Sequence, residues 1–149
     1  MDPDIDLTVP AQRRELPDHP VRTLGAISAG GVLGALARYG LGELWPHPVG
    51  TWAWSTLVVN TSGCLLIGVL MVLIDRRWPA RRLLRPFFGV GVLGGYTTFS
   101  TATLDVAQLV AAQRPGQALL YLAGTVLAAL AAVAAGSLLT TAALRAVQR

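Results

Sequence analysis

The sequence is poor in charge, cysteine and histidine, and it contains no lysine. Only 13% of its 149 residues are charged and 53% are hydrophobic, a composition too apolar for an ordinary soluble domain of this length. A single cysteine, Cys64, leaves no disulfide framework. The basic residues are all arginines that mostly flank apolar runs, so their excess indicates membrane-flanking charge and no nucleic-acid partner. These shortages predict an integral membrane protein.

The sequence also shows no set of residues typical of a catalytic site. The two histidines, His19 and His47, fall in an N-terminal tail and in a loop, with no nucleophile or metal-ligand set beside them. The sequence has no phosphate-binding loop either. We therefore predict that the chain is not an enzyme.

Four apolar segments follow a polar tail. Residues 1–22 are rich in proline and charge without periodicity, which predicts a disordered cytoplasmic tail ahead of a first apolar run that serves as a signal anchor. Each apolar segment is long enough for a helix across the hydrocarbon core, which needs about 20 residues. The sequence thus predicts an all-α fold, an integral membrane four-helix bundle in residues 23–149, with spans at about 23–45, 52–74, 87–112 and 118–144.

The arginines are distributed unevenly between the two ends of these spans. Four crossings place both termini and the loop at residues 76–85 on one side, and Arg114 is the loop arginine of the other side. Because positively charged loops stay inside the cell, we predict a multi-pass protein of the cell membrane with both termini cytoplasmic. The cytoplasmic arginines would be Arg13, Arg14, Arg22, Arg76, Arg77, Arg81, Arg82, Arg85, Arg145 and Arg149.

Small and polar residues mark the faces of the first two spans. Gly30, Gly34 and Gly42 recur at intervals of four or eight positions, which favours close packing of helices. On the second span Thr56 and Asn60 lie one turn apart, and an asparagine in an apolar helix needs partners for both halves of its amide. Asn60 either bonds a neighbouring helix or lines a polar path, and the residues alone leave both open.

Two charged residues lie well inside the ends of the apolar segments. Arg38 either snorkels to the outer interface near Trp45 or helps to attract an anion to a vestibule. Asp105 lies late in the third span, near a boundary, and is predicted to be interfacial or paired rather than catalytic.

The stretch GGYTTFST, residues 94–101, places paired glycines and four hydroxyls inside the third span. Glycine costs about 1 kcal/mol against alanine in a helix interior, and hydroxyls can bond backbone groups that lose their helical partners. We predict a broken third helix at Gly94 and Gly95; an unbroken, tightly packed helix is the alternative. Freed carbonyls at a break can coordinate a cation, and the positively polarised ring edge of Phe99 can meet an anion.

Taken together, these motifs resemble the CrcB/Fluc family of fluoride channels. The resemblance covers all four spans and rests on GVLGGYTTFST, the first-span glycines with Arg38, VNTSG around Asn60, and Tyr121 followed by Thr125. It implies a small four-helix subunit that forms an antiparallel dimer, with two narrow fluoride pathways around a central sodium ion.

The resemblance also implies roles for individual residues. The backbone carbonyls of Gly94 and Thr97 would be ligands of a structural Na⁺, and carbonyl oxygens suit such a hard cation. The positions assigned to the fluoride pathway and its surroundings are Asn60, Phe99, Thr98, Ser100, Tyr121, Thr125, Thr56 and Arg38.

Two positions depart from the family pattern. Ala102 stands where the family commonly has its second pore phenylalanine, and Ala129 where a second hydroxyl of the fourth-span track is expected. An antiparallel homodimer would therefore have incomplete pathways. Because the uneven arginines also fix one orientation, we predict a heterodimer with a paralogous subunit of opposite topology.

The function implied by the resemblance is a passive, fluoride-selective channel that lets fluoride leave the cytoplasm and so reduces its toxicity. An interior-negative potential drives anions outward by about 2.3 kcal/mol per charge per 100 mV, so no energy coupling is needed. One alternative is a small four-helix, proton-coupled multidrug exporter, with Asp105 as its ionisable acid. The other is a non-conducting structural subunit of a channel, which Ala102 makes relevant.

Overall fold

The computed structural model describes residues 20–147, so the tail predicted at residues 1–22 lies almost entirely outside the described residues. This described part is all-helical, without a strand. The first helix begins slightly before its predicted start, at a proline, which suits the first helical position. In chain order the helices are α2 Pro20–Leu44, α3 Trp54–Arg77, η1 Arg85–Leu93, α4 Gly94–Tyr96, α5 Phe99–Ala111 and α6 Pro115–Val147.

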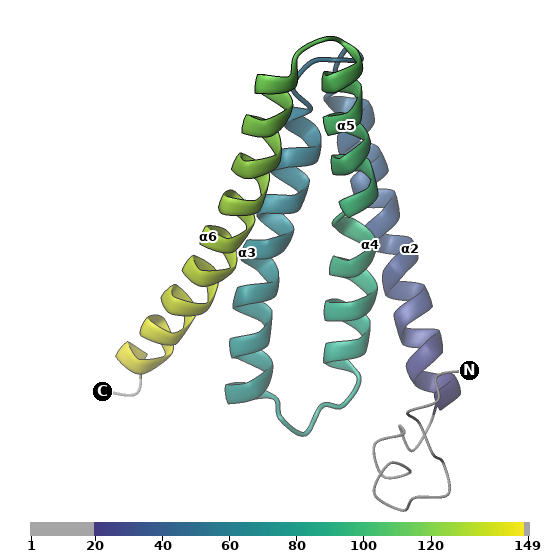
Figure 1. Ribbon diagram of the computed structural model, residues 1–149. Helices are drawn as coiled ribbons and strands as arrows, with labels where there is room; N and C mark the ends of the chain where they lie inside the picture. Colours follow the sequence, from purple (N-terminus) through teal and green to yellow (C-terminus); the bar gives the residue numbers. More distant parts are fainter. Residues whose placement is uncertain (1–19, 148–149) are drawn as a thin grey trace, which may run out of the picture.

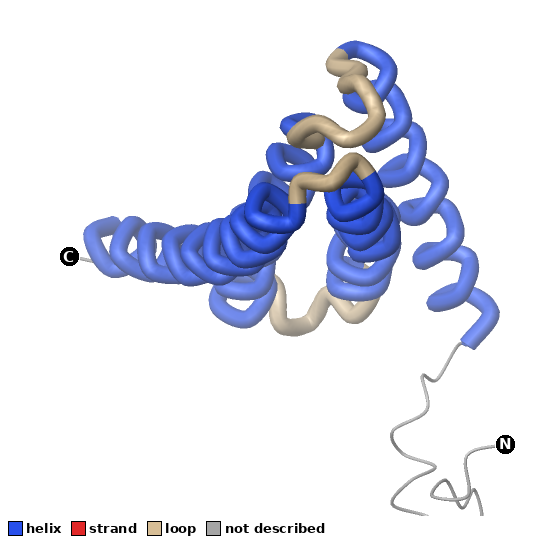
Figure 2. The backbone as a smooth tube through the Cα atoms, turned by 45° about the horizontal axis from the view of Figure 1, so that its top comes forward, coloured by secondary structure: helices blue, strands red, loops and turns tan. Residues whose placement is uncertain are grey.

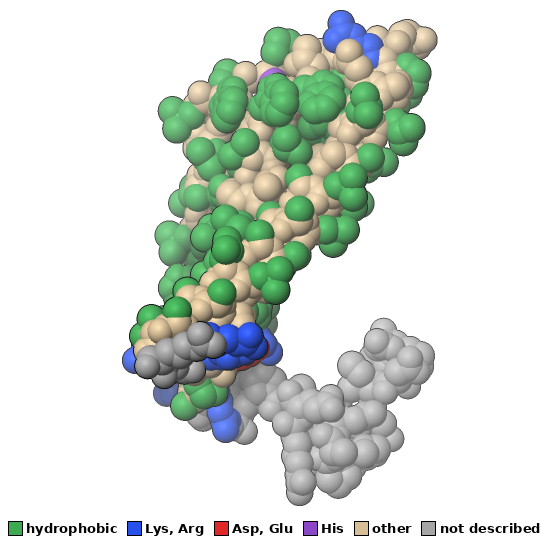
Figure 3. Space-filling model, turned by 90° about the vertical axis from the view of Figure 1, so that its left-hand side faces the viewer, with side chains coloured by type: hydrophobic (Ala, Val, Ile, Leu, Met, Phe, Trp, Pro, Cys, Tyr) green, Lys and Arg blue, Asp and Glu red, His purple; other side chains and the backbone are tan. Residues whose placement is uncertain are grey.

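Three of these helices, α2, α3 and α6, are long and apolar enough to cross a membrane. Their outer faces expose large apolar side chains, among them Leu36, Leu66 and Leu138. Figure 3 shows such side chains along the length of one face, with arginines gathered at the ends. The chain is thus a helical membrane protein, as its composition predicted. The segments η1, α4 and α5 occupy the predicted third span.

The helices pack mainly as two pairs, α3 with α6 and α2 with η1 and α4, while α5 packs against α6. Glycines keep these contacts short, because a Cβ on Gly68 would clash with the backbone of α6 and a Cβ on Gly136 with that of α3. Figures 1 and 2 show the loops at the two ends of the helices. The start of α2, the loop after α3 and the end of α6 lie at the same end (Figure 1).

Within the described chain, the glycines of the first span do not all have the packing role that was predicted. A Cβ on Gly30 or Gly34 would clash with backbone atoms of η1, so close packing is confirmed at these two positions. At Gly42 no neighbouring helix of this chain lies within 4 Å of where a Cβ would stand, so Gly42 has no packing partner within the described chain. Gly30 and Gly34 thus bring the backbones of α2 and η1 into close contact.

The third span is broken, but the break follows the glycine pair instead of falling on it. Gly94 and Gly95 are helical, and the chain becomes extended at Thr97 (φ −77°, ψ 156°) and Thr98 (φ −146°, ψ 122°). Gly95 has a different role, because a Cβ there would clash with the carbonyl of Gly31 in α2. The predicted location was thus wrong by a few residues: glycine admits the neighbouring helix, and the threonines leave the helical conformation.

The part of this span before the break is a π-helix, which the sequence did not predict. At its end the N–H of Gly94 bonds the carbonyl of Gly89, five residues earlier. A proline stands near its start, where a missing N–H costs no helical hydrogen bond. Such wide turns are rare and often lie next to functional sites, and here the π-helix leads directly to the break.

Candidate functional site

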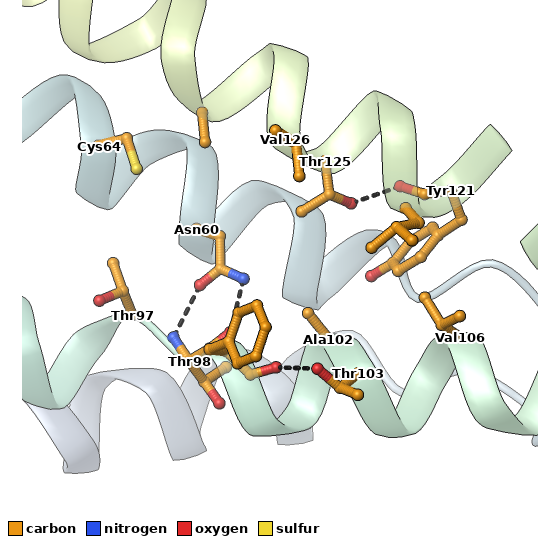
Figure 4. Close-up of a pocket in the computed structure, with 13 residues that line it drawn as sticks. Asn60, Cys64, Thr97, Thr98, Ala102, Thr103, Val106, Tyr121, Thr125 and Val126 are labelled. Carbon is orange, nitrogen blue, oxygen red and sulfur yellow. Dashed lines mark hydrogen bonds between the residues drawn. The ribbon is translucent and has the colours of Figure 1, made fainter. Parts of the chain in front are cut away.

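Asn60 of α3 clamps the break in the third span (Figure 4). Its Nδ2 donates to the carbonyl of Thr98 and its Oδ1 accepts from the N–H of Thr98, both at 2.8 Å. Both residues are buried, and a buried backbone group without a partner costs about 1–3 kcal/mol. Of the two roles left open for Asn60, the bond to a neighbouring helix is confirmed.

Hydroxyl groups close the two ends of the broken helix. Thr97 Oγ1 donates to the carbonyl of Leu93 at 2.9 Å. Thr98 Oγ1 accepts from the N–H of Thr101 at 3.1 Å, as the N-cap of α5, and donates to the Thr101 hydroxyl at 2.9 Å. Ser100 Oγ lies 3.4 Å from the same Thr98 oxygen. The prediction that hydroxyls compensate the broken hydrogen-bond ladder is confirmed.

The clamp and the cap take the N–H groups that would otherwise serve two carbonyls. In a regular helix the N–H of Thr98 would bond the carbonyl of Gly94, and the N–H of Thr101 that of Thr97. Instead the first donates to Asn60 and the second to the Thr98 hydroxyl. Gly94 and Thr97 thus lose the helical donors of their carbonyls, which fits the chemistry of a hard-cation ligand.

A cavity of about 260 Å³ opens beside the clamp, between α3, α5 and α6 (Figure 4). We call it the clamp cavity. It brings together residues from three helices that are far apart in the sequence. Five of the predicted pathway residues line it: Asn60, Thr98, Phe99, Tyr121 and Thr125.

The two departures from the family pattern, Ala102 and Ala129, line this same cavity. Phe99 at its edge is 84% exposed, so most of its ring has no contact within this chain. The remaining lining residues were missed, because they are ordinary apolar or hydroxyl side chains that only helical spacing from Phe99 and Tyr121 would have indicated. These are Cys64, Thr103, Val106, Leu122 and Val126, together with the side chain of Thr97.

A second cavity, of about 480 Å³, lies on the other side of Thr98, which lines both cavities. We call it the vestibule. Arg38 and Thr56 line it, so Arg38 lies in the wall of a polar cavity, as one of its two predicted roles requires. Ser100 lines neither cavity. The sequence did not indicate four other polar residues of the vestibule wall, Glu43, His47, Ser55 and Thr101. Glu43 and His47 lie at the end of α2 and in the loop after it, and the path of that loop depends on the fold.

Asp105, Tyr121 and His47 meet beside the cavities. The Tyr121 hydroxyl lies 3.1 Å from the carbonyl of Ala53 and 3.4 Å from Asp105 Oδ2, and it can donate its proton to either. His47 Nε2 lies 3.5 Å from Asp105 Oδ1. Asp105 is only 4% exposed and lies beside Tyr121 and His47, so the prediction that it is paired is confirmed. The sequence showed no catalytic or metal-binding residues beside His47, and the fold brings Asp105 next to it.

Thr125 does not present its proton to the clamp cavity in this conformation. Its Oγ1 donates to the carbonyl of Tyr121, one turn earlier in α6, at 2.7 Å. Thr125 and Tyr121 are both buried. At the start of the polar track predicted on this helix, the hydroxyl protons of Tyr121 and Thr125 are therefore already used in hydrogen bonds within the chain.

The donors around the break do not form a conventional metal centre. Within residues 20–147, no three histidine, cysteine, aspartate or glutamate side chains gather where they could hold a metal ion. A cation bound at the break would therefore depend on backbone oxygens. The arrangement suits a small ion that exchanges water for amide, hydroxyl and carbonyl groups.

Comparison with known proteins assigns the chain to a family. Residues 25–137 match the family described as "CrcB-like protein, Camphor Resistance (CrcB)". The chain belongs to the CrcB family. The match contains both cavities and the whole broken span.

Three relatives are similar to this chain over most of their own length. The "Fluoride-specific ion channel FluC 2" of Nocardia farcinica is 57% identical over 112 residues, 75% of this chain and 80% of that protein. The protein of the same name in Streptomyces avermitilis is 49% identical over 124 residues, 83% and 78% of the two chains. That of Thermobifida fusca is 53% identical over 114 residues, 76% and 84% of the two chains.

Membership of the CrcB family confirms the resemblance drawn from the motifs. The names of these relatives are those of ion channels, so the prediction that the chain is not an enzyme is also confirmed. The roles of single residues in an ion pathway are not decided by the comparisons. The clamp, the two cavities and the diverted hydrogen bonds are the observations from which such roles are proposed below.

Proposed function

We propose that this chain is a subunit of a fluoride-selective channel that lets fluoride leave the cytoplasm passively and so reduces its toxicity. The observation that carries this proposal is the clamp of Asn60 on Thr98, at a helix break between two cavities, in a chain of the CrcB family. Fluoride specificity is taken from the names of its relatives.

The pathway would run from the vestibule past Thr98 into the clamp cavity. An asparagine amide carries two N–H donors, and the Thr98 carbonyl takes one of them, so the second is available to a passing anion. Fluoride is strongly hydrated, and such donors would replace part of its water shell. Arg38 in the vestibule wall would raise the local concentration of anions.

An antiparallel dimer is part of the proposal. Phe99 is exposed at the edge of the clamp cavity, and Ala102 leaves space in the cavity wall, so the pathway needs a second subunit to complete it. The uneven arginines favour one orientation, with both termini in the cytoplasm and η1, α4 and α5 as a fourth, interrupted span. Relatives numbered FluC 2 and FluC 3 in Streptomyces avermitilis support a paralogous partner.

A structural sodium ion is proposed at the break, held by the carbonyls of Gly94 and Thr97. Support comes from the diversion of their helical donors to Asn60 and to the Thr98 hydroxyl. Gly94 is exposed in the single chain, so a partner subunit could supply the other ligands. Bound there, the ion would offset the electrostatic cost of unpaired carbonyls in a membrane interior.

The test is fluoride efflux from liposomes that hold this chain, alone and with its paralogue. We expect efflux that needs no nucleotide or proton gradient, exceeds chloride efflux, and depends on Asn60. No fluoride efflux with either composition would contradict the proposal. Fluoride flux that survives Asn60 and Phe99 substitutions in this chain would instead favour the structural subunit.

The exporter alternative is tested at Asp105, the ionisable acid that such a mechanism would use. In an exporter, Asp105→Asn would abolish resistance to organic cations and leave fluoride efflux untouched. In a channel, no cation resistance depends on this residue. The same cells and liposomes therefore distinguish the two functions.

A further inference from the structure

A third cavity lies at the opposite end of the molecule from the vestibule loops. It measures about 260 Å³ and lies where α3, the loop after it and η1 meet. Four of its five lining residues are apolar, and two of these, Trp78 and Phe88, are each about two-fifths exposed. The lining residues are Leu70, Trp78, Arg81, Leu84 and Phe88.

One arginine, Arg81, lines this cavity, and it belongs to a loop that is rich in positive charge. Residues 75–85 contain five arginines against a single acid, Asp75. Asp75 is already paired with Arg85, at 3.2 Å, across the loop that joins α3 to η1. Figure 3 shows arginine side chains gathered at this end of the molecule. The cavity therefore combines an apolar wall with one lining arginine, in a loop of net positive charge.

The position and the size of the cavity indicate what kind of ligand it can bind. Tryptophan is enriched where a membrane meets water, and Trp78 ends α3 there. A cavity of this size is smaller than the roughly 300–1,000 Å³ typical of sites for whole small molecules, so it suits part of a larger molecule that continues into the bilayer. Basic pockets on the cytoplasmic side of membrane helices are suited to anionic lipid headgroups.

We propose that this cavity binds one anionic phospholipid of the cytoplasmic leaflet. The upper part of an acyl chain lies against Leu70, Leu84 and Phe88, and the headgroup phosphate lies at Arg81. Trp78 packs beside the glycerol region. The lipid would bridge α3 and η1, the two elements on either side of the loop, and would favour the orientation with this loop inside the cell. The proposal rests on the proposed membrane topology.

The test uses the tryptophan in the cavity as a reporter. The full chain is reconstituted in phosphatidylcholine vesicles that contain phosphatidylglycerol with brominated acyl chains, which quench nearby tryptophan. The other tryptophans lie at the opposite end, in residues 45–54, so the Trp78 signal is the difference from Trp78→Phe. We expect quenching of Trp78 by phosphatidylglycerol to exceed that by equally brominated phosphatidylcholine about fivefold, the effect of one arginine near an anionic headgroup.

Arg81→Gln should remove most of this preference, and Arg114→Gln, at the other end of the molecule, should leave it unchanged. Equal quenching by the two lipids, or a preference that persists in Arg81→Gln, would overturn the proposal. If excess inorganic phosphate abolished the preference, the cavity would be a site for a free anion and the lipid proposal would be wrong. Fluoride efflux of each variant, reconstituted together with the paralogue, is measured in parallel. Loss of lipid preference with normal efflux supports the lipid site, and absence of efflux from the unsubstituted chain both alone and with the paralogue contradicts the proposed function without touching the lipid site.

Discussion

The second span of this protein is a continuous helix and the third is interrupted, and a polar residue of the second compensates the interruption of the third. The helix α3 runs unbroken from Trp54 to Arg77 and carries a buried asparagine. The third span is a π-helix, a short helix, an extended pair and a second helix. The polar side chain of the regular helix supplies the hydrogen bonds that the irregular one has lost. A polar residue on one membrane helix can thus indicate a defect in its neighbour.

The largest effect is expected when the clamp is removed. Asn60→Ala leaves the buried N–H and carbonyl of Thr98 without partners, at about 1–3 kcal/mol for each group, so the protein should lose about 3 kcal/mol of stability. Thermal unfolding in detergent measures the loss. Cys64→Ala changes the wall of the same cavity without removing a hydrogen bond that the structure shows, and it should cost clearly less. Equal costs would show that the clamp contributes little.

The two adjacent glycines provide a sharper comparison within the third span. Gly95→Ala forces a Cβ against the carbonyl of Gly31, a backbone atom that cannot rotate away, so it should destabilise by about 1–3 kcal/mol. Gly94→Ala should be neutral or slightly stabilising, because its Cβ would come no closer than 3.9 Å to the Gly89 carbonyl and alanine is the better helix former. Thermal unfolding of the two variants would contradict this packing if Gly94→Ala were the worse.

The cap of α5 should have an intermediate effect. Thr98→Val keeps the shape of the side chain but removes the oxygen that accepts from the N–H of Thr101, at a cost of about 1 kcal/mol. Thr98→Ser retains that oxygen and should stay close to the unsubstituted protein. Denaturation of both variants in detergent tests this. A Thr98→Ser variant as unstable as Thr98→Val would mean that packing, not capping, matters at this position.

The smallest effect is expected at the end of the same two spans. Asp75 and Arg85 join α3 to η1, but their side chains are 62% and 57% exposed. Such pairs contribute about 0–1 kcal/mol, so Asp75→Asn should change the unfolding temperature very little. The change should shrink further in high salt. A loss as large as that from Asn60→Ala would show that this ion pair, rather than the clamp, holds the third span to α3.

Much of the architecture could be predicted from the sequence, because apolar length and charge are local properties. The three long spans, the helical class and a break near residues 94–101 all follow from composition and motif. The site residues Asn60, Phe99, Tyr121 and Thr125 could be placed together only through the resemblance, and Ser100 lies beside Thr98 without lining either cavity. The cavity-lining apolar residues carried no signal of their own.

The sequence by itself determined that this chain enters a membrane, because hydrophobicity and charge act on each segment alone, and it favoured a break in the third span over an unbroken helix. Only the tertiary structure decided where that span breaks and which side chain bonds the backbone groups that the break leaves without helical partners. The break falls where Asn60 of a distant helix reaches Thr98, and Gly95 stays helical because α2 packs directly on it. A hydrogen bond between segments depends on their relative position, which no local pattern of residues specifies.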